Sequence, residues 1–315
     1  MLFFLPPAVR GAAALTLLTF NTLAWCTLVL CVALLKWALP LPSVRRQVDP
    51  LLNRMAGYWI TCNSGWMRLT QRTVWDVEGA GALQYRNWYL VNCNHQSWVD
   101  IFVLQRVLNG RVPLLKFFLK HQLIYLPLIG LAWWALDFPF LRRNTKEDLR
   151  RHPERRLSDR EATRRACEKF ALVPTSVISF AEGTRFTPAK RQQQNAPYRH
   201  LLKPRAGALA LTLNAMGEQF HSLLDVTIVY PAGAPTFWQF LCGRVPKIVV
   251  RMRELPIPDG FNSRDYAQDR AFRREFQHWL GGMWEFKDEQ IEAVLAQQRG
   301  GDGSAKEKQP SGVSL

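Results

Sequence analysis

A histidine and an aspartate five residues apart directly follow an apolar run typical of a buried strand. The stretch begins at residue 92 and reads NCNHQSWVD, so the two residues are His95 and Asp100. A carboxylate that binds an imidazole fixes its tautomer and orientation, and such an imidazole is a common general base. The spacing therefore indicates a site that removes a proton from a substrate.

The same residues also fit a purely structural role. Ser97 to Asp100 is an S-x-x-D pattern, in which the serine caps a helix and the aspartate occupies the third helical position. Residues five apart do not share a face of a regular helix. The catalytic hypothesis therefore requires His95 to lie in the turn before the helix, with its ring folded back. The sequence leaves both interpretations open.

A second motif, FAEGTRF, follows the strand-like stretch SVISF. Glycine permits a tight turn and close approach of a ligand, and the arginine fork suits a phosphate group. A solvated turn with an ion pair between Glu182 and Arg185 is the alternative. Further cations adjoin apolar segments and favour an anionic headgroup site: Lys116, Lys120, Arg142, Arg143, Lys203 and Arg205.

Strands and helices alternate along the rest of the chain, which predicts an α/β fold with active groups at strand ends. Strands are expected at 88–94, 138–143, 176–180, 223–231 and 247–255, and helices at 97–108, 158–172, 206–217 and 267–298.

The N-terminal segment between Arg10 and Lys36 has 25 residues without a charge, long enough to cross a bilayer. Basic residues follow this segment more than they precede it, which predicts that the rest of the chain is cytoplasmic. A basic linker is expected over 41–56. Residues 57–75 are expected to form either an interfacial helix or a plain core helix. The apolar run 123–141 is broken by Pro and Gly, so a surface-seated or re-entrant segment is expected there.

The chain carries 41 Lys and Arg against 25 Asp and Glu, a formal charge of +16. This charge suits an anionic membrane surface, phosphorylated substrates or nucleic acid. A membrane-tethered nucleic-acid-binding module is one alternative, but no helix-turn-helix, RNP-like block or zinc motif supports it. The spacing of the Cys and His residues gives no metal site.

The ordered stretches NHQSWVD, FPFLRR, FAEGTRF and VTIVYP resemble the four blocks of the PlsC-like glycerolipid acyltransferases, which include 1-acylglycerol-3-phosphate acyltransferase. The resemblance covers about residues 85–255. RRHPERR and TRRACEKF are further similar to the inner-membrane YihG-like members. The family implies a mixed α/β sheet with surrounding helices, here preceded by an N-terminal transmembrane helix.

The resemblance also implies roles for single residues. His95 corresponds to the general base and Asp100 to its orienting partner. The substrate-binding positions are Glu182, Gly183, Thr184, Arg185, Lys120, Arg142, Arg143 and Arg205. The chain departs from the family pattern at Gln122, where Glu is usual, and at Asp137 and Pro139, which replace a Gly-rich start of the second block.

The expected function is acyl transfer from acyl-CoA or acyl-carrier protein to a lysophospholipid, first of all 1-acyl-sn-glycerol 3-phosphate, which gives phosphatidic acid. No cofactor is expected beyond the donor substrate, no nucleic acid is expected as a partner, and the location would be the cytoplasmic side of a bacterial inner membrane. The expected parts are an anchor at 1–40, a linker-helix region at 41–80, an acyltransferase domain at 81–299 and a disordered tail at 300–315. Three alternatives remain: Cys93 as a nucleophile, the membrane-tethered nucleic-acid-binding module, or an inactive lipid-binding scaffold. A different lysolipid acceptor is a fourth.

Overall fold

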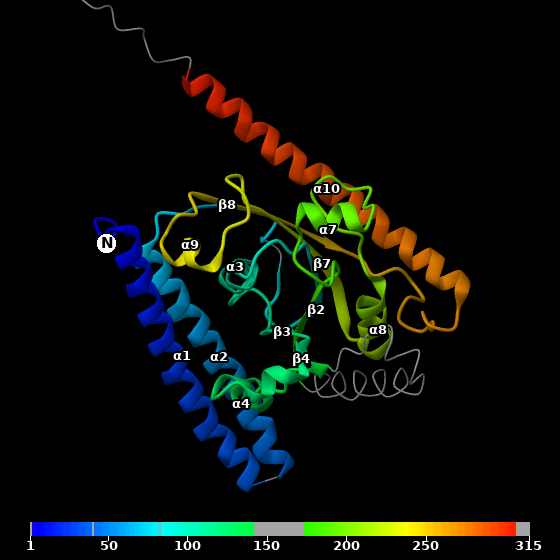
Figure 1. Ribbon diagram of the computed structural model, residues 1–315. Helices are drawn as coiled ribbons and strands as arrows, with labels where there is room; N and C mark the ends of the chain where they lie inside the picture. Colours follow the sequence, from blue (N-terminus) through cyan, green and yellow to red (C-terminus); the bar gives the residue numbers. More distant parts are fainter. Residues whose placement is uncertain (1, 40, 82, 142–172, 307–315) are drawn as a thin grey trace, which may run out of the picture.

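A computed structural model describes residues 2–39, 41–81, 83–141 and 173–306 (Figure 1). Two long N-terminal helices lie side by side along the sheet-containing part of the chain, and a third long helix crosses that part near the C-terminus. A mixed sheet lies between them. This arrangement confirms the expected α/β class with helices around a mixed sheet.

The sheet has six strands in the order β1-β8-β7-β2-β6-β3. Among the strands of the described residues, β7–β8 is the antiparallel pair of this sheet. Strands β7, β2, β6 and β3 therefore run in one direction, and their carboxyl ends meet at one edge. The bounds are β1 Val74–Glu78, β2 Trp88–Cys93, β3 Leu115–Phe117, β6 Ser176–Phe180, β7 Phe220–Val229 and β8 Lys247–Leu255. Strands β2, β6, β7 and β8 confirm the sequence prediction, whereas β1 and β3 were not foreseen.

Alternation of side chains along the strands divides the core into two layers. In β2, Val91 and Cys93 face one layer and Leu90 faces the other, as the two-residue period of a strand requires. Helices α3 (Val99–Leu108) and α9 (Phe237–Leu241) cover the first face. Helices α8 (Ala206–Met216) and α10 (Arg270–Lys306) cover the second. Helix α10 thus continues into the segment 300–315 that was expected to be disordered.

The predicted linker over 41–56 is wrong, because helix α2 spans Pro42–Thr70. Proline is well suited to the first helical turn, where its missing N–H needs no partner. Val48, Leu52, Met55 and Ala56 then recur at helical spacing and form a buried stripe. This stripe packs against α1 (Pro7–Ala38) and the short helix α4 (Ile129–Ala135). The basic residues that suggested a linker occupy the exposed side of the same helix.

Helix α1, Pro7–Ala38, is long and apolar enough to cross a membrane by length and composition. Both ends of α1 also contact residues within 81–299. Near its start, Arg10 Nε donates to the carbonyl oxygen of Cys242 at 2.9 Å. Near its end, Lys36 Nζ lies 2.7 Å from Asp49 Oδ1 and 3.0 Å from Asp137 Oδ2.

The apolar run 123–141 forms only short elements. They are a 3-10 helix η1 (His121–Tyr125), helix α4 (Ile129–Ala135) and strand β5 (Phe140–Leu141), which pairs with β4 (Leu119–Lys120). None is long enough to cross a bilayer. Tyr125 and Trp134 are exposed, consistent with the expected surface-seated segment.

Three sequence predictions fall outside the described residues. They are the arginines Arg142 and Arg143, the helix over 158–172, and the stretches RRHPERR and TRRACEKF. The small helix α7, Pro188–Gln193, follows the FAEGTRF motif within the described part of the chain.

Candidate active site

The candidate site is formed where three neighbouring parallel strands end. His95 follows β2, Glu182 follows β6 and Tyr230 follows β7. Loops at the carboxyl ends of parallel strands are the usual place for ligands in such sheets. The sheet order therefore brings together residues that are far apart in the sequence.

The imidazole of His95 and the carboxylate of Asp100 form a hydrogen-bonded pair. Nδ1 of His95 lies 2.8 Å from Oδ2 of Asp100. The histidine side chain is 15% exposed and the aspartate side chain is fully buried, so only the base is within reach of a substrate. The imidazole stacks on the ring of Phe180, with ring centroids 4.1 Å apart and planes 19° apart. This contact holds the ring in the folded-back orientation that the catalytic hypothesis requires.

Asp100 binds the backbone of the turn before α3 as well as the histidine. Its Oδ2 also accepts hydrogen bonds from the backbone N–H groups of Gln96 (2.6 Å) and Ser97 (2.8 Å). The Ser97 hydroxyl accepts from the N–H of Val99 and donates to the carbonyl of Pro235. The two interpretations left open by the sequence therefore describe one set of contacts.

The fourth donor to Asp100 is Tyr230, which the sequence analysis missed. Its hydroxyl donates to Oδ1 of Asp100 at 2.6 Å, and the side chain is buried. Burial, together with the negative charge of Asp100, raises the pKa of Tyr230 well above its usual range, so the phenol stays protonated. Its position directly after a long apolar strand and before a proline was the only signal in the sequence.

Glu182 is fully buried and bonded to backbone on both sides. Oε1 accepts from the N–H of His95 at 2.8 Å, and Oε2 accepts from the N–H of Leu202 at 2.9 Å. Burial raises the pKa of Glu182 to about 7, and the two backbone hydrogen bonds offset only part of this effect. Direct contact with an acceptor, as the resemblance implies, does not fit this burial.

Gly183 allows the loop to turn back beneath the histidine. Its φ of +70° lies in the region that favours glycine, and a Cβ atom there would meet the side chain of Arg205 at 3.2 Å. The backbone of Arg205 is bonded to the carbonyl of Ala181, and the N–H of Phe186 donates to the carbonyl of His95. The FAEGTRF loop is thus fixed to the residues around the base.

Arg185 presents its guanidinium at the surface beside the site. Its Cζ lies 5.1 Å from the ring centroid of Trp98, at the start of α3. Lys190 Nζ donates to the Thr184 hydroxyl (2.8 Å) and to the carbonyl of Arg185 (3.0 Å). The loop therefore offers a stacked arginine and a fixed ammonium group to an anion.

Lys120, the remaining described candidate, is exposed in the two-stranded sheet of β4 and β5. The structure therefore joins His95, Asp100 and the residues 182–185 with Arg205, and it leaves Lys120 in a separate element.

A buried ion pair supports the sheet below these loops, and the sequence analysis missed it as well. Lys287 Nζ on α10 lies 2.9 Å from Asp225 Oδ1 on β7, and both side chains are fully or nearly fully buried. The same ammonium donates to the carbonyl of Val226. Helix α10 also reaches the site through Trp284, whose Nε1 donates to the carbonyl of Leu202.

Cys93 does not have the properties of a nucleophile. Its side chain is fully buried in the core layer beneath α3. Burial raises the pKa of the Cys93 thiol well above its usual range. Because the thiolate is the reactive form, this environment disfavours the alternative in which Cys93 attacks the substrate.

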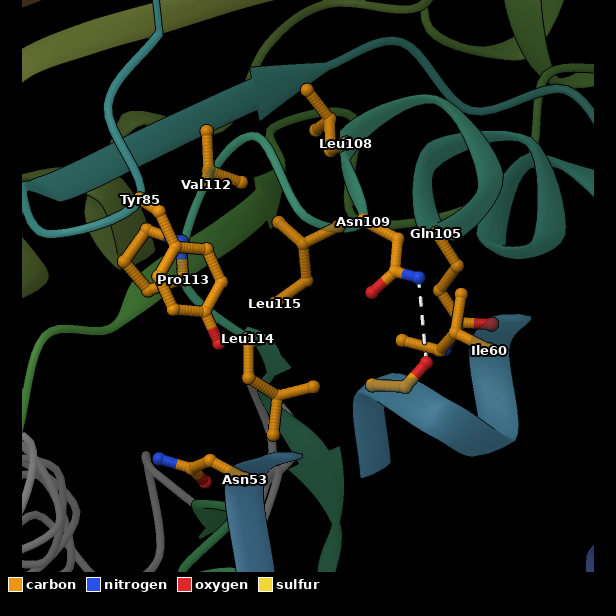
Figure 2. A pocket seen from close by; sticks show the side chains of 11 residues that line it. Asn53, Ile60, Tyr85, Gln105, Leu108, Asn109, Val112, Pro113, Leu114 and Leu115 are labelled. Carbon is orange, nitrogen blue, oxygen red and sulfur yellow. Dashed lines mark hydrogen bonds between the residues drawn. The ribbon is translucent and has the colours of Figure 1, made fainter. Parts of the chain in front are cut away.

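Figure 2 shows a surface pocket away from these residues, between α2, the end of α3 and the segment before β3. Asn109 Nδ2 donates to the carbonyl of Gly57 across it, at 3.3 Å. Among the described residues, no group of three or more His, Cys, Asp or Glu could hold a metal ion.

Comparison with known proteins gives a consistent family. The family described as Acyltransferase matches residues 75–232, about half of the chain. Lysophosphatidylinositol acyltransferase 10 of Caenorhabditis elegans is 25% identical over 83% of this chain and 66% of its own length. The rat 1-acyl-sn-glycerol-3-phosphate acyltransferase delta is 23% identical over 82% of this chain and 70% of its own length.

The chain covers 59% and 66% of the length of the first two curated relatives, less than two thirds. Among solved structures, the 1-acyl-sn-glycerophosphate acyltransferase PlsC from Thermotoga maritima is 19% identical, with a TM-score of 0.49, and the match covers 89% of this chain and 98% of that one. The matched family segment contains the strands β2, β3, β6 and β7 and all of β1 except its first residue. It also contains the histidine-aspartate pair and its glutamate and tyrosine partners. The chain therefore belongs to the acyltransferase family.

Proposed function

We propose that this protein transfers a fatty acyl group from a coenzyme A or acyl-carrier-protein thioester to a hydroxyl of a lysophospholipid. The first candidate acceptor is 1-acyl-sn-glycerol 3-phosphate, and the product would be phosphatidic acid. The observation that carries the proposal is the His95–Asp100 pair, 2.8 Å apart, beside an exposed arginine loop. The name of the rat relative supports this acceptor.

In the proposed reaction, His95 is the general base. Nδ1–H donates to Asp100, so Nε2 is left as the acceptor atom of the neutral ring. Nε2 takes the proton of the acceptor hydroxyl while its oxygen attacks the thioester carbonyl. The carbon–sulfur bond then breaks, and the imidazolium returns the proton to the departing thiolate. A positioned base of this kind contributes about 10²- to 10⁴-fold.

The thioester is already activated, so the proposed reaction needs no covalent acyl-enzyme. The burial and raised pKa of Cys93 support direct transfer over a thiol relay. Asp100 stabilises the imidazolium through its hydrogen bond with Nδ1, and the four donors around its two oxygens hold the carboxylate in place.

The acceptor phosphate is proposed to bind at Arg185. A guanidinium pairs with a phosphate through two parallel charge-assisted bonds, and stacking on Trp98 restricts its orientation before binding. Lys190 on α7 and Arg205, just before α8, add positive charge beside this loop. Lys120, Arg142 and Arg143 remain proposed contacts for the acceptor, and Gly183 and Thr184 shape the loop.

The name of the nematode relative favours a second acceptor, a lysophosphatidylinositol. That lipid carries a phosphodiester with a bulky sugar-like headgroup instead of a terminal phosphate. Both acceptors offer a glycerol hydroxyl to His95, so the proposed chemistry is the same and only the contacts with the headgroup differ.

The protein is further proposed to act at a membrane, on the cytoplasmic side of a bacterial inner membrane. A helix that crossed the bilayer would separate its two ends by about 30 Å of hydrocarbon. Yet the two ends of α1 both contact residues within 81–299: Arg10 donates to the carbonyl of Cys242, and Lys36 forms an ion pair with Asp137. These contacts favour an α1 that lies along one face of the membrane, with its exposed apolar side chains in lipid: Leu17, Phe20, Leu23, Leu28, Leu34 and Leu35.

The test is to incubate membranes containing the protein with labelled acyl-CoA or acyl-carrier protein and a panel of lysophospholipids. We expect transfer to 1-acyl-sn-glycerol 3-phosphate in the wild type and its loss in His95→Ala. His221→Ala is the control. His221 is exposed and lies away from the site, where its Nε2 is 3.8 Å from Oε1 of Glu254. Wild-type turnover in His95→Ala would exclude the proposed base, and the absence of transfer to every acceptor would favour the lipid-binding scaffold.

A further inference from the structure

Tyr230 occupies a position that no sequence motif assigns to the chemistry. It is the residue directly after β7, and β7 pairs in parallel with β2, the strand that leads to His95. The two strands therefore deliver Tyr230 and the base to the same edge of the sheet. The tyrosine side chain is 3% exposed, so it is part of the floor of the site and out of reach of solvent.

The hydrogen bonds of Asp100 are divided between its two oxygens. Oδ2 receives the imidazole and two backbone N–H groups, from Gln96 and Ser97. Oδ1 receives only the hydroxyl of Tyr230, at 2.6 Å. Without this hydroxyl, Oδ1 would be a buried charged oxygen without a donor among the described contacts. A buried charged oxygen without a donor is costly in free energy.

We infer that Tyr230 is a positioning residue that makes the pair of His95 and Asp100 a three-residue chain. Its hydroxyl fixes the plane of the carboxylate so that Oδ2 faces the imidazole. It also draws negative charge away from Oδ2, which moderates how strongly the carboxylate attracts the imidazolium proton. This inference rests on the proposed role of His95 as the base.

Several other titratable or charged groups lie near Tyr230, Asp100 and His95 and would respond to a change in the charge of these three residues. They are Cys93 at the end of β2, Glu182 after β6, Asp225 on β7 and Lys287 on α10, which interact electrostatically with Asp100 or with one another. None of them donates a hydrogen bond to Oδ1 among the described contacts, so none replaces the phenol.

The decisive variant is Tyr230→Phe, which removes one hydroxyl and keeps the ring. We expect kcat to fall about tenfold, because one hydrogen bond to a charged group is lost, while KM for both substrates stays unchanged. The acidic limb of the pH–rate profile should move to higher pH by about half a unit to one unit, because the carboxylate with one donor fewer holds the imidazolium proton more strongly.

Tyr89→Phe is a matched control. Tyr89 is a buried tyrosine on the adjacent strand β2, and its hydroxyl accepts a hydrogen bond from the N–H of Gln84, outside the site. This variant should lose comparable stability without any change in kcat or in the pH profile. Equal losses of kcat in the two variants would reduce Tyr230 to a structural residue and overturn the inference.

A second substitution covers the case in which Tyr230→Phe does not fold. Incorporation of 3-fluorotyrosine at position 230 keeps the shape and makes the phenol a stronger donor. The acidic limb should then move to lower pH, opposite to the shift in the phenylalanine variant. An unchanged or upward shift would contradict the inference.

A readout without acyl transfer separates this inference from the proposed function. The rate at which diethyl pyrocarbonate modifies His95, followed by mass spectrometry across pH, reports the neutral imidazole directly. Its pH midpoint should rise in Tyr230→Phe and stay unchanged in Tyr89→Phe. If the wild type transferred no acyl group but this shift were seen, the proposed function would fail and the positioning role would stand. An absent shift would overturn the role itself.

Discussion

The carboxylate of Glu182 accepts a hydrogen bond from the backbone N–H of His95 at 2.8 Å, while its second oxygen accepts from Leu202 at 2.9 Å. The glutamate therefore ties the base to a loop that α10 holds in turn, through the contact between Trp284 and the Leu202 carbonyl. The fixed position of His95 thus depends on a helix that begins 175 residues later, at Arg270.

Glu182 predicts a pH dependence of stability with a definite sign. Its pKa is raised from 4.5 to about 7 in the folded protein, mainly by burial. The folded state thus binds this proton more tightly than the unfolded chain. The stabilisation is fully present below about pH 4.5 and is lost as the pH rises through about 7, which amounts to about 3 kcal/mol. The free energy of unfolding of the wild type should fall by this amount relative to Glu182→Gln over that range.

Urea unfolding at several pH values measures this difference. Glu292→Gln is a control for the sign, because the hydrogen bond from His200, and then that from Arg299, lowers the pKa of Glu292. The contribution of Glu292 to the free energy of unfolding should instead be present at higher pH and be lost as the pH falls. A constant difference between the wild type and Glu182→Gln would show that the glutamate does not titrate in this range.

Arg185→Lys tests the phosphate contact. A lysine cannot form the two parallel bonds of a guanidinium, so KM for the acceptor should rise about tenfold while KM for the thioester stays unchanged. Arg191→Lys is the matched control, since Arg191 is an exposed arginine on α7 that donates to the carbonyl of Arg199. A raised thioester KM with an unchanged acceptor KM would reassign Arg185 to the phosphates of the donor.

Cys93→Ala tests direct transfer. The thiol is buried and its pKa is raised, so the variant should keep a kcat within about twofold of the wild type and lose about 1 kcal/mol of stability, as core truncations of this size do. Mass spectrometry of the wild type after addition of the thioester should detect no acylated Cys93. Loss of activity together with a trapped acyl-enzyme would restore the thiol mechanism.

The attachment of α1 predicts where the two ends of the chain lie. Arg10 and Lys36, at opposite ends of α1, both contact residues within 81–299, so both ends of α1 should lie on one side of the membrane. Tags at residues 1 and 315 should therefore be accessible from the same side of sealed membrane vesicles. Deletion of residues 1–36 should weaken membrane binding and also destabilise the protein, since Ala14 and Val29 are buried against the rest of the chain. Labelling of the two tags from opposite sides would show that α1 crosses the bilayer.

The sequence by itself determined the features that depend on neighbouring residues. Strand β8 is found at Lys247–Leu255, as the apolar run predicts, and the His95–Asp100 pair forms within one turn. Local patterns of this kind are set by backbone geometry over a few residues, so their periodicity or spacing is visible in the chain. The same holds for the turn at Gly183, where the positive φ requires the residue type that is present.

Only the tertiary structure decided which distant residues complete the site. Glu182 suggested a contact with the acceptor, but the structure buries its carboxylate against the backbone of His95. Lys287 carried no local signal, and Tyr230 carried only its place after an apolar strand and before a proline. The residues 41–56 that were taken for a linker belong to α2, whose apolar stripe packs against α1 and α4. Such contacts follow from the order of strands in the sheet and from which helix faces are buried. Both depend on the free energy of packing the whole chain, which no short stretch of sequence contains.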